Sequence, residues 1–301
     1  INRVSTINKI SMLYLFLSIL SSIAILIIFK IIGKYNIKVI QPIIINYFVA
    51  SVLGYLSAGI SSKEVLQIPA DWILPGVIIG SLYVFTFFLI GYSTKKAGMA
   101  LTTIASKMSF VFPMFFSILI DTKDNYSNIK FILLIMAIIA VFLSVYKKRV
   151  KTIDSLFIIF LPFILFVLMG IADSLVKYSQ NYYIKDESQS SIFSFLIFSF
   201  AALWGLLLIM FQKDKKEILQ PKVLIIGIIL GICNFGSLYF FINALNSLTF
   251  NNSLVIALNN MGVVLFSIII ALSFFKEKTT KLNKAGIAFT IITFIAIMTL
   301  I

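Results

Sequence analysis

Two ionisable side chains fall inside stretches of the sequence that are otherwise apolar. Lys107 lies in TTIASKMSFVFP, residues 102–113, and Asp173 lies in GIADSLVK, residues 170–177. A charge inside a bilayer costs at least ~2.5–3.5 kcal/mol, so such residues face a bundle interior or a water-filled cavity. A lysine there can bind a carboxylate or a phosphate, and an aspartate can hold an amine or a proton. The two residues therefore predict a cavity that takes zwitterionic or anionic solutes.

A structural role stays open for both charges. Lys177 stands one helical turn after Asp173, so these two side chains could pair on one helix. Lys107 could likewise be a structural lysine with a partner elsewhere in the chain. Because the sequence contains no histidine, any coupling to protons would fall on Asp173 or on Lys107.

Small polar side chains accompany Lys107 at helical spacing and could line the same cavity. They are Thr102, Thr103, Ser106 and Ser109. Pro113 has no N–H to bond the carbonyl of Ser109, so we expect the helix to open there and to supply an acceptor.

Other polar residues in apolar stretches are further candidates for contacts with a solute. In decreasing order they are Asn259 and Asn260, then Asn234, Asn243, Asn46, Tyr83 and Tyr92. Each of them could instead make an interhelical hydrogen bond. Glu277, between Lys276 and Lys278, is expected to form a loop-end ion pair or to lie at a helix N-terminus rather than to bind a substrate.

The composition indicates an integral membrane protein. The 301 residues are 60% hydrophobic and 12% charged, with a mean hydropathy of +1.08, whereas soluble domains have roughly 25% charged residues. Long apolar runs predict ten membrane-spanning helices. They lie at about 10–32, 40–60, 72–94, 99–120, 129–146, 155–178, 190–211, 223–245, 251–274 and 284–301. The first is too long for a signal peptide and is expected to be retained. Trp72, at the start of the third, is expected to anchor it at the interface, and Trp204 could pack inside or line the cavity.

The basic residues predict the orientation of these spans. Loops after odd-numbered spans hold 17 of the 25 Lys and Arg residues, the opposite side holds 7, and Lys107 completes the set. The positive-inside rule therefore places the odd-numbered loops in the cytoplasm and both termini outside, in the inner membrane of a bacterium. The basic loop residues that set this orientation account for the net charge of +14, so no nucleic-acid partner is expected.

The two halves of the chain resemble each other. GVIIGSLYVFTFFLIGYS from Gly76 matches GIILGICNFGSLYFFINA from Gly227, and FSILI at 116–120 matches FSIII at 266–270. A further match, ending at Lys30 and Lys177, keeps the offset between about 147 and 151 residues. Five spans in each half give an inverted repeat, 1–150 and 151–301, with a substrate site near the midplane. Chance similarity between apolar sequences is the alternative.

The repeat adds expectations about particular residues. At an offset of 150 residues, Asn259 and Asn260 correspond to Ser109 and Phe110 in the first half. They are therefore expected near Lys107. Four glycines at small-xxx-small spacing are expected to pack helices closely. They are Gly76, Gly80, Gly227 and Gly231.

The chain resembles the drug/metabolite transporter superfamily, specifically its EamA-like family. GYSTKKAGMALTTIASKMSFVFPMFFSIL at 91–119 and SIIIALSFFKEKTTKLNKAGIAF at 267–289 carry the resemblance, which covers essentially the whole chain. It implies ten spans in two five-span halves, and export of small metabolites without ATP. The glutamate that the family pattern has after the fourth span is missing, and Asp121 and Asp124 stand there instead.

Together these features predict a secondary active transporter that works by alternating access and is not an enzyme. The expected cavity is centred on spans 3, 4, 8 and 9, with span 6, and the expected partners are a small amino-acid-like or anionic solute, membrane lipids and a coupling proton or ion. A flippase of lipids or lipid-linked intermediates is the alternative. One cysteine, Cys233, and no histidine exclude an intrachain disulfide and leave few ligands for zinc or haem, so no cofactor is expected. The substrate, the direction of transport and the oligomeric state stay open.

Overall fold

A computed structural model of the chain describes residues 2–65, 67–113, 153–184, 186–211, 215–247 and 252–300, with isolated positions from 116 to 143. Over these residues the chain consists of helices joined by short connections. The longer helices are α1 (Asn2–Lys34), α2 (Ile40–Ala58), α4 (Ala70–Lys96), α5 (Met99–Met108), α8 (Ile153–Tyr183), α9 (Glu187–Met210), α10 (Pro221–Ser247), α11 (Asn252–Ser273) and α12 (Lys281–Leu300). Two short elements, α3 (Ser62–Val65) and the 3-10 helix η1 (Lys215–Leu219), lie in connections.

Seven helices of the described chain are long and apolar enough to cross a membrane. They are α1, α2, α4, α8, α9, α10 and α11, at the places predicted for spans 1, 2, 3, 6, 7, 8 and 9. The described residues are thus all-helical and agree with the predicted class, an all-α membrane protein. The predicted fifth span is described only at scattered positions, and α12 covers the predicted tenth. The count of ten and the 5+5 repeat stay predictions.

The chain forms two compact units, each built from both halves of the sequence. Unit 1 comprises Ile1–Phe88 and Tyr178–Thr249, and unit 2 comprises Leu89–Lys177 and Phe250–Ile301. The boundaries fall inside α4 and α8. The predicted division at residue 150 concerns the repeat rather than the packing, and it stays a prediction.

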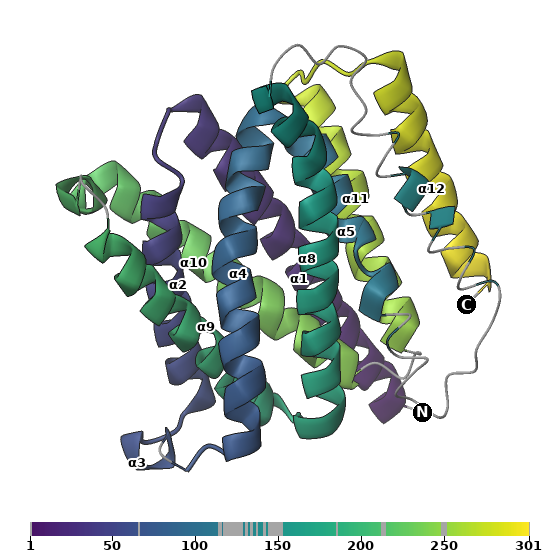
Figure 1. Ribbon diagram of the computed structural model, residues 1–301. Helices are drawn as coiled ribbons and strands as arrows, with labels where there is room; N and C mark the ends of the chain where they lie inside the picture. The colour runs from purple at the N-terminus through teal and green to yellow at the C-terminus, as the bar shows by residue number, and fades with distance from the viewer. Residues whose placement is uncertain are drawn as a thin grey trace. The chain divides into compact units, whose positions relative to one another are not determined.

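Glycines bring the helices of unit 1 into backbone contact. A Cβ on Gly80 of α4 would lie 2.7 Å from the carbonyl oxygen of Ile197 in α9, and a Cβ on Gly231 of α10 would lie 2.7 Å from that of Asn46 in α2. Figure 1 shows α2, α9 and α10 beside one another, as their contacts require. The prediction that these glycines serve close helix packing is confirmed.

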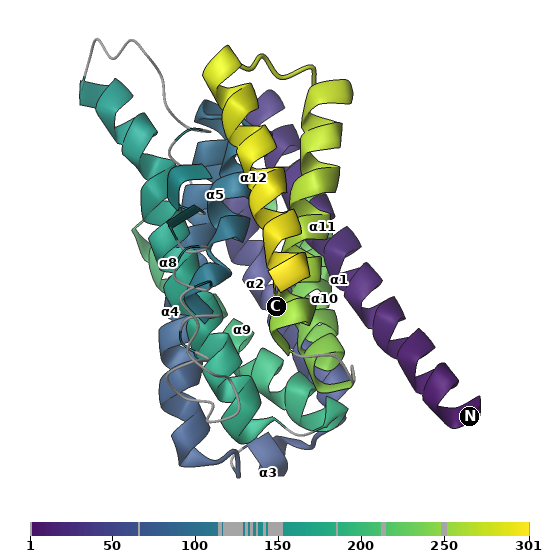
Figure 2. The ribbon, with the colours of Figure 1, turned by 90° about the vertical axis from the view of Figure 1, so that its right-hand side faces the viewer.

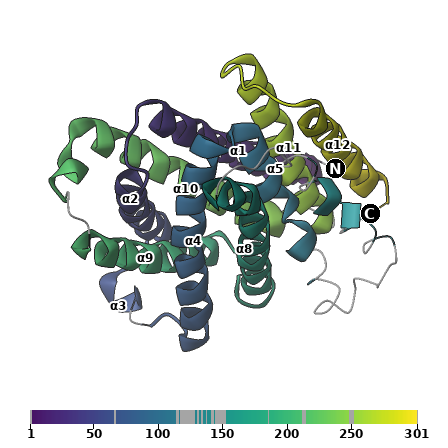
Figure 3. The ribbon, with the colours of Figure 1, turned by 45° about the horizontal axis from the view of Figure 1, so that its top comes forward.

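A hydrogen bond joins α2 and α9 where they cross. The hydroxyls of Ser51 and Ser199 lie 2.7 Å apart, and a Cβ on Gly54 would meet the backbone of Phe195 at 2.8 Å. Figure 3 shows these two helices side by side. Small side chains thus make this crossing close, as is common between helices in lipid.

In unit 2, α5 packs against α11 and also contacts α12 (Figure 2). The helix α5 is shorter than the predicted fourth span, because it ends at Met108 and residues 109 and 110 form a turn before helical residues 111–113. The break lies where Pro113 was expected to open the helix. The freed carbonyl of Ser109 does not stay available, because the N–H of Phe112 donates to it at 2.9 Å.

The two tryptophans lie in different surroundings. Trp72 is buried against the rings of Tyr183 and Phe193, and its role as an interfacial anchor stays a prediction. Trp204 is 45% exposed and its Nε1 donates to the hydroxyl of Ser81 at 2.7 Å. It is therefore accessible rather than packed in an apolar interior, and the alternative that it lines a cavity stays a prediction.

The glycine contacts predict a stability difference. Gly80→Ala and Gly231→Ala should each destabilise the protein by about 1–3 kcal/mol, because the new methyl group must displace backbone atoms of a neighbouring helix. Melting temperatures of the purified variants in detergent measure the effect. Gly205→Ala is the matched control, since its Cβ would find only ordinary contact with Ile44 at 3.5 Å. An equal loss in all three variants would contradict the interpretation.

Candidate functional site

Lys107 lies in the last turn of α5, in unit 2, and is neither buried nor fully exposed. The hydroxyls of the same helix are buried and donate to its own carbonyls: Thr103 to Met99 at 2.8 Å, and Ser106 to Thr103 at 3.2 Å. Such bonds satisfy the hydroxyl protons inside the helix. The oxygens keep lone pairs that can accept from a neighbouring donor.

Asp173 of α8 contacts the turn that follows Lys107. The hydroxyl of Ser109 lies 3.3 Å from Oδ2 of Asp173 and 2.6 Å from the carbonyl of Ser106, so its single proton serves one of these acceptors at a time. The opposite charges of Asp173 and Lys107 attract each other, but the two side chains form no direct ion pair. Lys177 is not among the partners of Asp173, so the predicted pair on one helix is not observed.

The arrangement brings together two half-buried, opposite charges that do not neutralise each other by contact. An ammonium and a carboxylate in direct contact would satisfy one another, whereas this pair leaves donors on Lys107 and lone pairs on Asp173 for a third group. A solute with both an acidic and a basic group could bridge them. Ser109, buried in the turn after α5, contacts the carboxylate of Asp173.

The asparagines of α11 also belong to unit 2. Asn259 and Asn260 are 4% and 5% exposed, on a helix that packs against α5. The side-chain nitrogen of Asn260 donates to the carbonyl of Ile256 at 2.8 Å, whereas Oδ1 of Asn259 is buried without a hydrogen-bond partner. The repeat-based expectation that α11 accompanies α5 therefore agrees with the packing, and Asn259 offers an unused acceptor.

The remaining candidates are divided between the units. Tyr83, Asn234, Asn243 and Asn46 belong to unit 1, and Tyr92 belongs to unit 2. Asn46 is fully buried and neither of its amide atoms has a partner, and the same holds for the amide nitrogen of Asn234. For these groups the interhelical hydrogen bond that was the alternative is not observed.

Sequence reasoning missed Tyr47, the neighbour of Asn46 on α2. Its ring packs against Phe87 and Phe198, and its hydroxyl is buried with no hydrogen-bond partner. Tyr83 packs against the same Phe198. A tyrosine in an apolar run resembles any core aromatic residue, so only the unused hydroxyl distinguishes it, and that signal requires the structure.

Comparisons with known proteins bear on the fold. No family model matches the chain. A protein of Haemophilus influenzae (strain ATCC 51907 / DSM 11121 / KW20 / Rd), described as uncharacterized, is 27% identical over 284 residues, which cover 92% of this chain and 94% of that protein. A solved crystal structure is similar over 97% of this chain and 98% of its own, with a TM-score of 0.63 and 12% identity. The chain thus shares its fold with a protein of known structure.

The unused amide of Asn46 predicts an unusual result for a core substitution. Asn46→Leu should leave the melting temperature unchanged or raise it, because a buried polar group without a partner costs about 1–3 kcal/mol and leucine removes that cost. Asn46→Asp, of nearly the same shape, should destabilise the protein by burying a charge. A clear loss of stability in Asn46→Leu would indicate that the amide makes a bond important for folding.

Proposed function

We propose that this protein is a secondary active transporter of the drug/metabolite transporter superfamily, EamA-like, and that it moves a small zwitterionic or anionic metabolite by alternating access. The observation that carries the proposal is the pair Lys107 and Asp173 in unit 2. Two opposite charges on apolar helices that attract without touching have a high cost in a membrane. A binding function explains why the chain bears that cost.

The crossing of α2 and α9 supports the inverted repeat on which alternating access rests. Ser51 and Ser199 are 148 residues apart and share a hydrogen bond, and the offset predicted from the sequence is between about 147 and 151. The two serines therefore come from nearly equivalent positions of the two halves. Nearly equivalent positions approach each other beside a two-fold axis, which is the symmetry of an inverted repeat.

The glycine contacts repeat under one offset. A Cβ on Gly80 in α4 would lie 2.7 Å from the carbonyl oxygen of Ile197 in α9, and a Cβ on its counterpart Gly231 in α10 would lie 2.7 Å from that of Asn46 in α2. Gly80 and Gly231 are 151 residues apart, and so are Asn46 and Ile197. Two crossings with equivalent partners on both sides favour a true repeat over chance similarity of apolar sequences.

The charges set the chemical class of the solute. A single lysine would favour any anion, whereas Lys107 with Asp173 favours a molecule that carries both a carboxylate or phosphate and an amine. Ser109 and the acceptor of Asn259 add neutral hydrogen-bonding groups in the same unit. Amino-acid-like metabolites fit this set, and export is the direction that the family resemblance implies.

Ligand-induced stabilisation tests the proposal. Purified wild type should be stabilised by one class of soluble zwitterion or anion from a panel of amino acids, nucleosides, organic acids and lipids, by about 2.7 kcal/mol at 100 times the Kd. Lys107→Met and Asp173→Asn should abolish this shift in melting temperature, because each removes one of the two charges.

Lys177→Met is the matched control, since Lys177 is a neighbouring lysine that does not pair with Asp173. It should keep the ligand-induced shift. Equal shifts in wild type and Lys107→Met would show that Lys107 does not bind the solute. Stabilisation by lipids alone would favour a flippase of lipids or lipid-linked intermediates.

A further inference from the structure

A carboxylate from one helix end caps the start of another helix in unit 2. Oε1 of Glu277 accepts from the backbone N–H of Met99 at 2.7 Å, and Oε2 accepts from that of Ala100 at 3.3 Å. These are the first two residues of α5, whose N–H groups have no partner within the helix. The residue before them is Gly98, which has no side chain to cap them. Glu277 supplies the cap from the connection between α11 and α12.

Glu277 is itself held to the end of α11. Its N–H donates to the carbonyl of Ala271 at 3.0 Å, and the preceding Lys276 adopts a left-handed conformation with φ 49°. This is how a helix C-terminus commonly closes, although a lysine rather than a glycine occupies the position here. Figure 1 shows the start of α5 and the connection from α11 to α12 at the same end of unit 2. The carboxylate therefore ties the end of α11 directly to the start of α5.

The backbone conformation and the surroundings of Gly98 both suit this contact. Its φ of 105° is a conformation that side chains rarely adopt, and a Cβ would lie 2.9 Å from Oε2 of Glu277. Both the backbone angle and the available space therefore require glycine. Sequence reasoning expected Glu277 to be a loop-end ion pair or a charge at a helix N-terminus, and the second alternative is confirmed, on a helix that lies 177 residues earlier in the chain.

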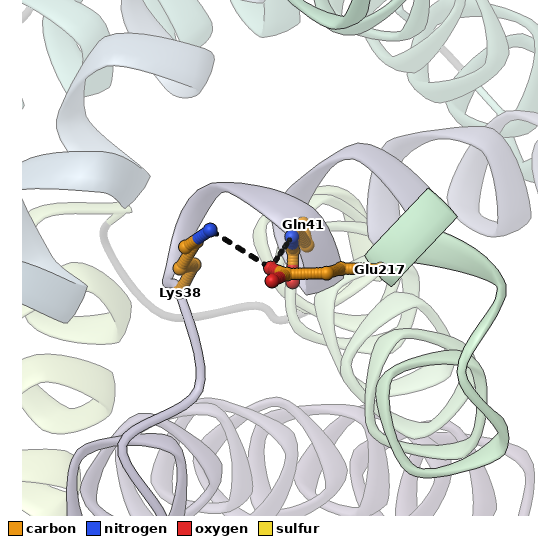
Figure 4. A network of polar contacts seen from close by, with 3 residues as sticks. All are labelled: Lys38, Gln41 and Glu217. Carbon is orange, nitrogen blue, oxygen red and sulfur yellow. Dashed lines mark hydrogen bonds and ion pairs between the residues drawn. The ribbon is translucent and has the colours of Figure 1, made fainter. Parts of the chain in front are cut away.

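Unit 1 has a carboxylate link that provides a contrast. Glu217 of η1 accepts from Nε2 of Gln41 at 2.8 Å and pairs with Nζ of Lys38 at 2.9 Å (Figure 4). The side chains of Lys38 and Glu217 are 48% and 38% exposed, and exposed ion pairs contribute little. Both links lie in loops after odd-numbered spans, which are predicted to face the cytoplasm. Only the link of Glu277 caps backbone groups at the start of the helix that carries Lys107.

We infer that the contact of Glu277 with the start of α5 is a latch, which must break before a solute can reach Lys107 from that end of unit 2. The inference rests on the proposed transport function. Lys107 lies eight residues beyond Met99, about 12 Å along the helix. With the latch formed, the ends of α5 and α11 are fixed to each other. With the latch broken, α5 loses its cap and the two ends can separate.

Cysteine accessibility tests the latch. The background is Cys233→Ser, which removes the single native cysteine, and Ser106→Cys is the reporter one residue before Lys107. Membrane-impermeant maleimide is applied to each side of sealed vesicles of known orientation. Glu277→Gln should raise the labelling rate about tenfold or more from the side of the α11–α12 connection only, because it removes hydrogen bonds to a charged acceptor. Gly98→Ala should act in the same direction by displacing the carboxylate.

Two variants serve as controls. Glu217→Gln makes the same chemical change in the exposed link of unit 1, and Lys278→Gln changes the charge beside Glu277 while leaving the carboxylate in place. Both should label within about twofold of the background. An unchanged rate in Glu277→Gln, or an equal rise from both sides, would overturn the latch.

The result separates the latch from the proposed substrate. If labelling is unchanged while a soluble ligand still stabilises the wild type through Lys107, the latch is wrong and the transport proposal stands. If labelling rises from one side while no soluble ligand is found, the latch is supported and the soluble substrate is wrong.

Discussion

Backbone contact between apolar helices is the constraint on which unit 1 depends. Lipid chains are as apolar as leucine side chains, so burial of apolar surface does not by itself bring such helices together. The chain instead places small residues where helices cross, at Gly80 against α9, at Gly231 against α2 and at Ser51 against Ser199. Dispersion contacts and one hydrogen bond then act at short range. The same crossings set which faces of α2, α4, α9 and α10 are left for polar side chains.

Polar groups without partners stand out against this packing. Asn46 and the hydroxyl of Tyr47 are buried without a hydrogen bond, in a unit whose crossings are otherwise close. In unit 2, Lys107 and Asp173 attract each other without an ion pair. Each of these groups reduces the stability of the empty protein, and a bound solute or water would recover part of that cost. Selection for folding alone would favour apolar residues at these positions.

The sequence predicted the helices better than it predicted the contacts between them. Length and hydropathy predicted the seven long helices, and Pro113 predicted the break after Lys107, because both signals are local. The partner of Asp173 could not be predicted. Lys177 lies one helical turn away on the same helix, whereas Ser109 belongs to the turn that follows α5. The partner of Glu277 and the burial of Trp72 depend equally on contacts across long stretches of chain. The repeat was the one sequence signal that reached such distances, and it anticipated the pairing of α5 with α11.

An inverted repeat also limits how the two ends of a transporter can differ. If the halves were identical, the states open to either side would have equal free energy, and any bias must come from residues that break the symmetry. Glu277 is such a residue, because the first half of the sequence has Asp121 and Asp124 where a matching glutamate is expected. A capping contact made with a charged acceptor stabilises the state in which its own end is closed. The resting state of this protein would then be set by the chemistry of one loop residue acting on an otherwise balanced pair of states.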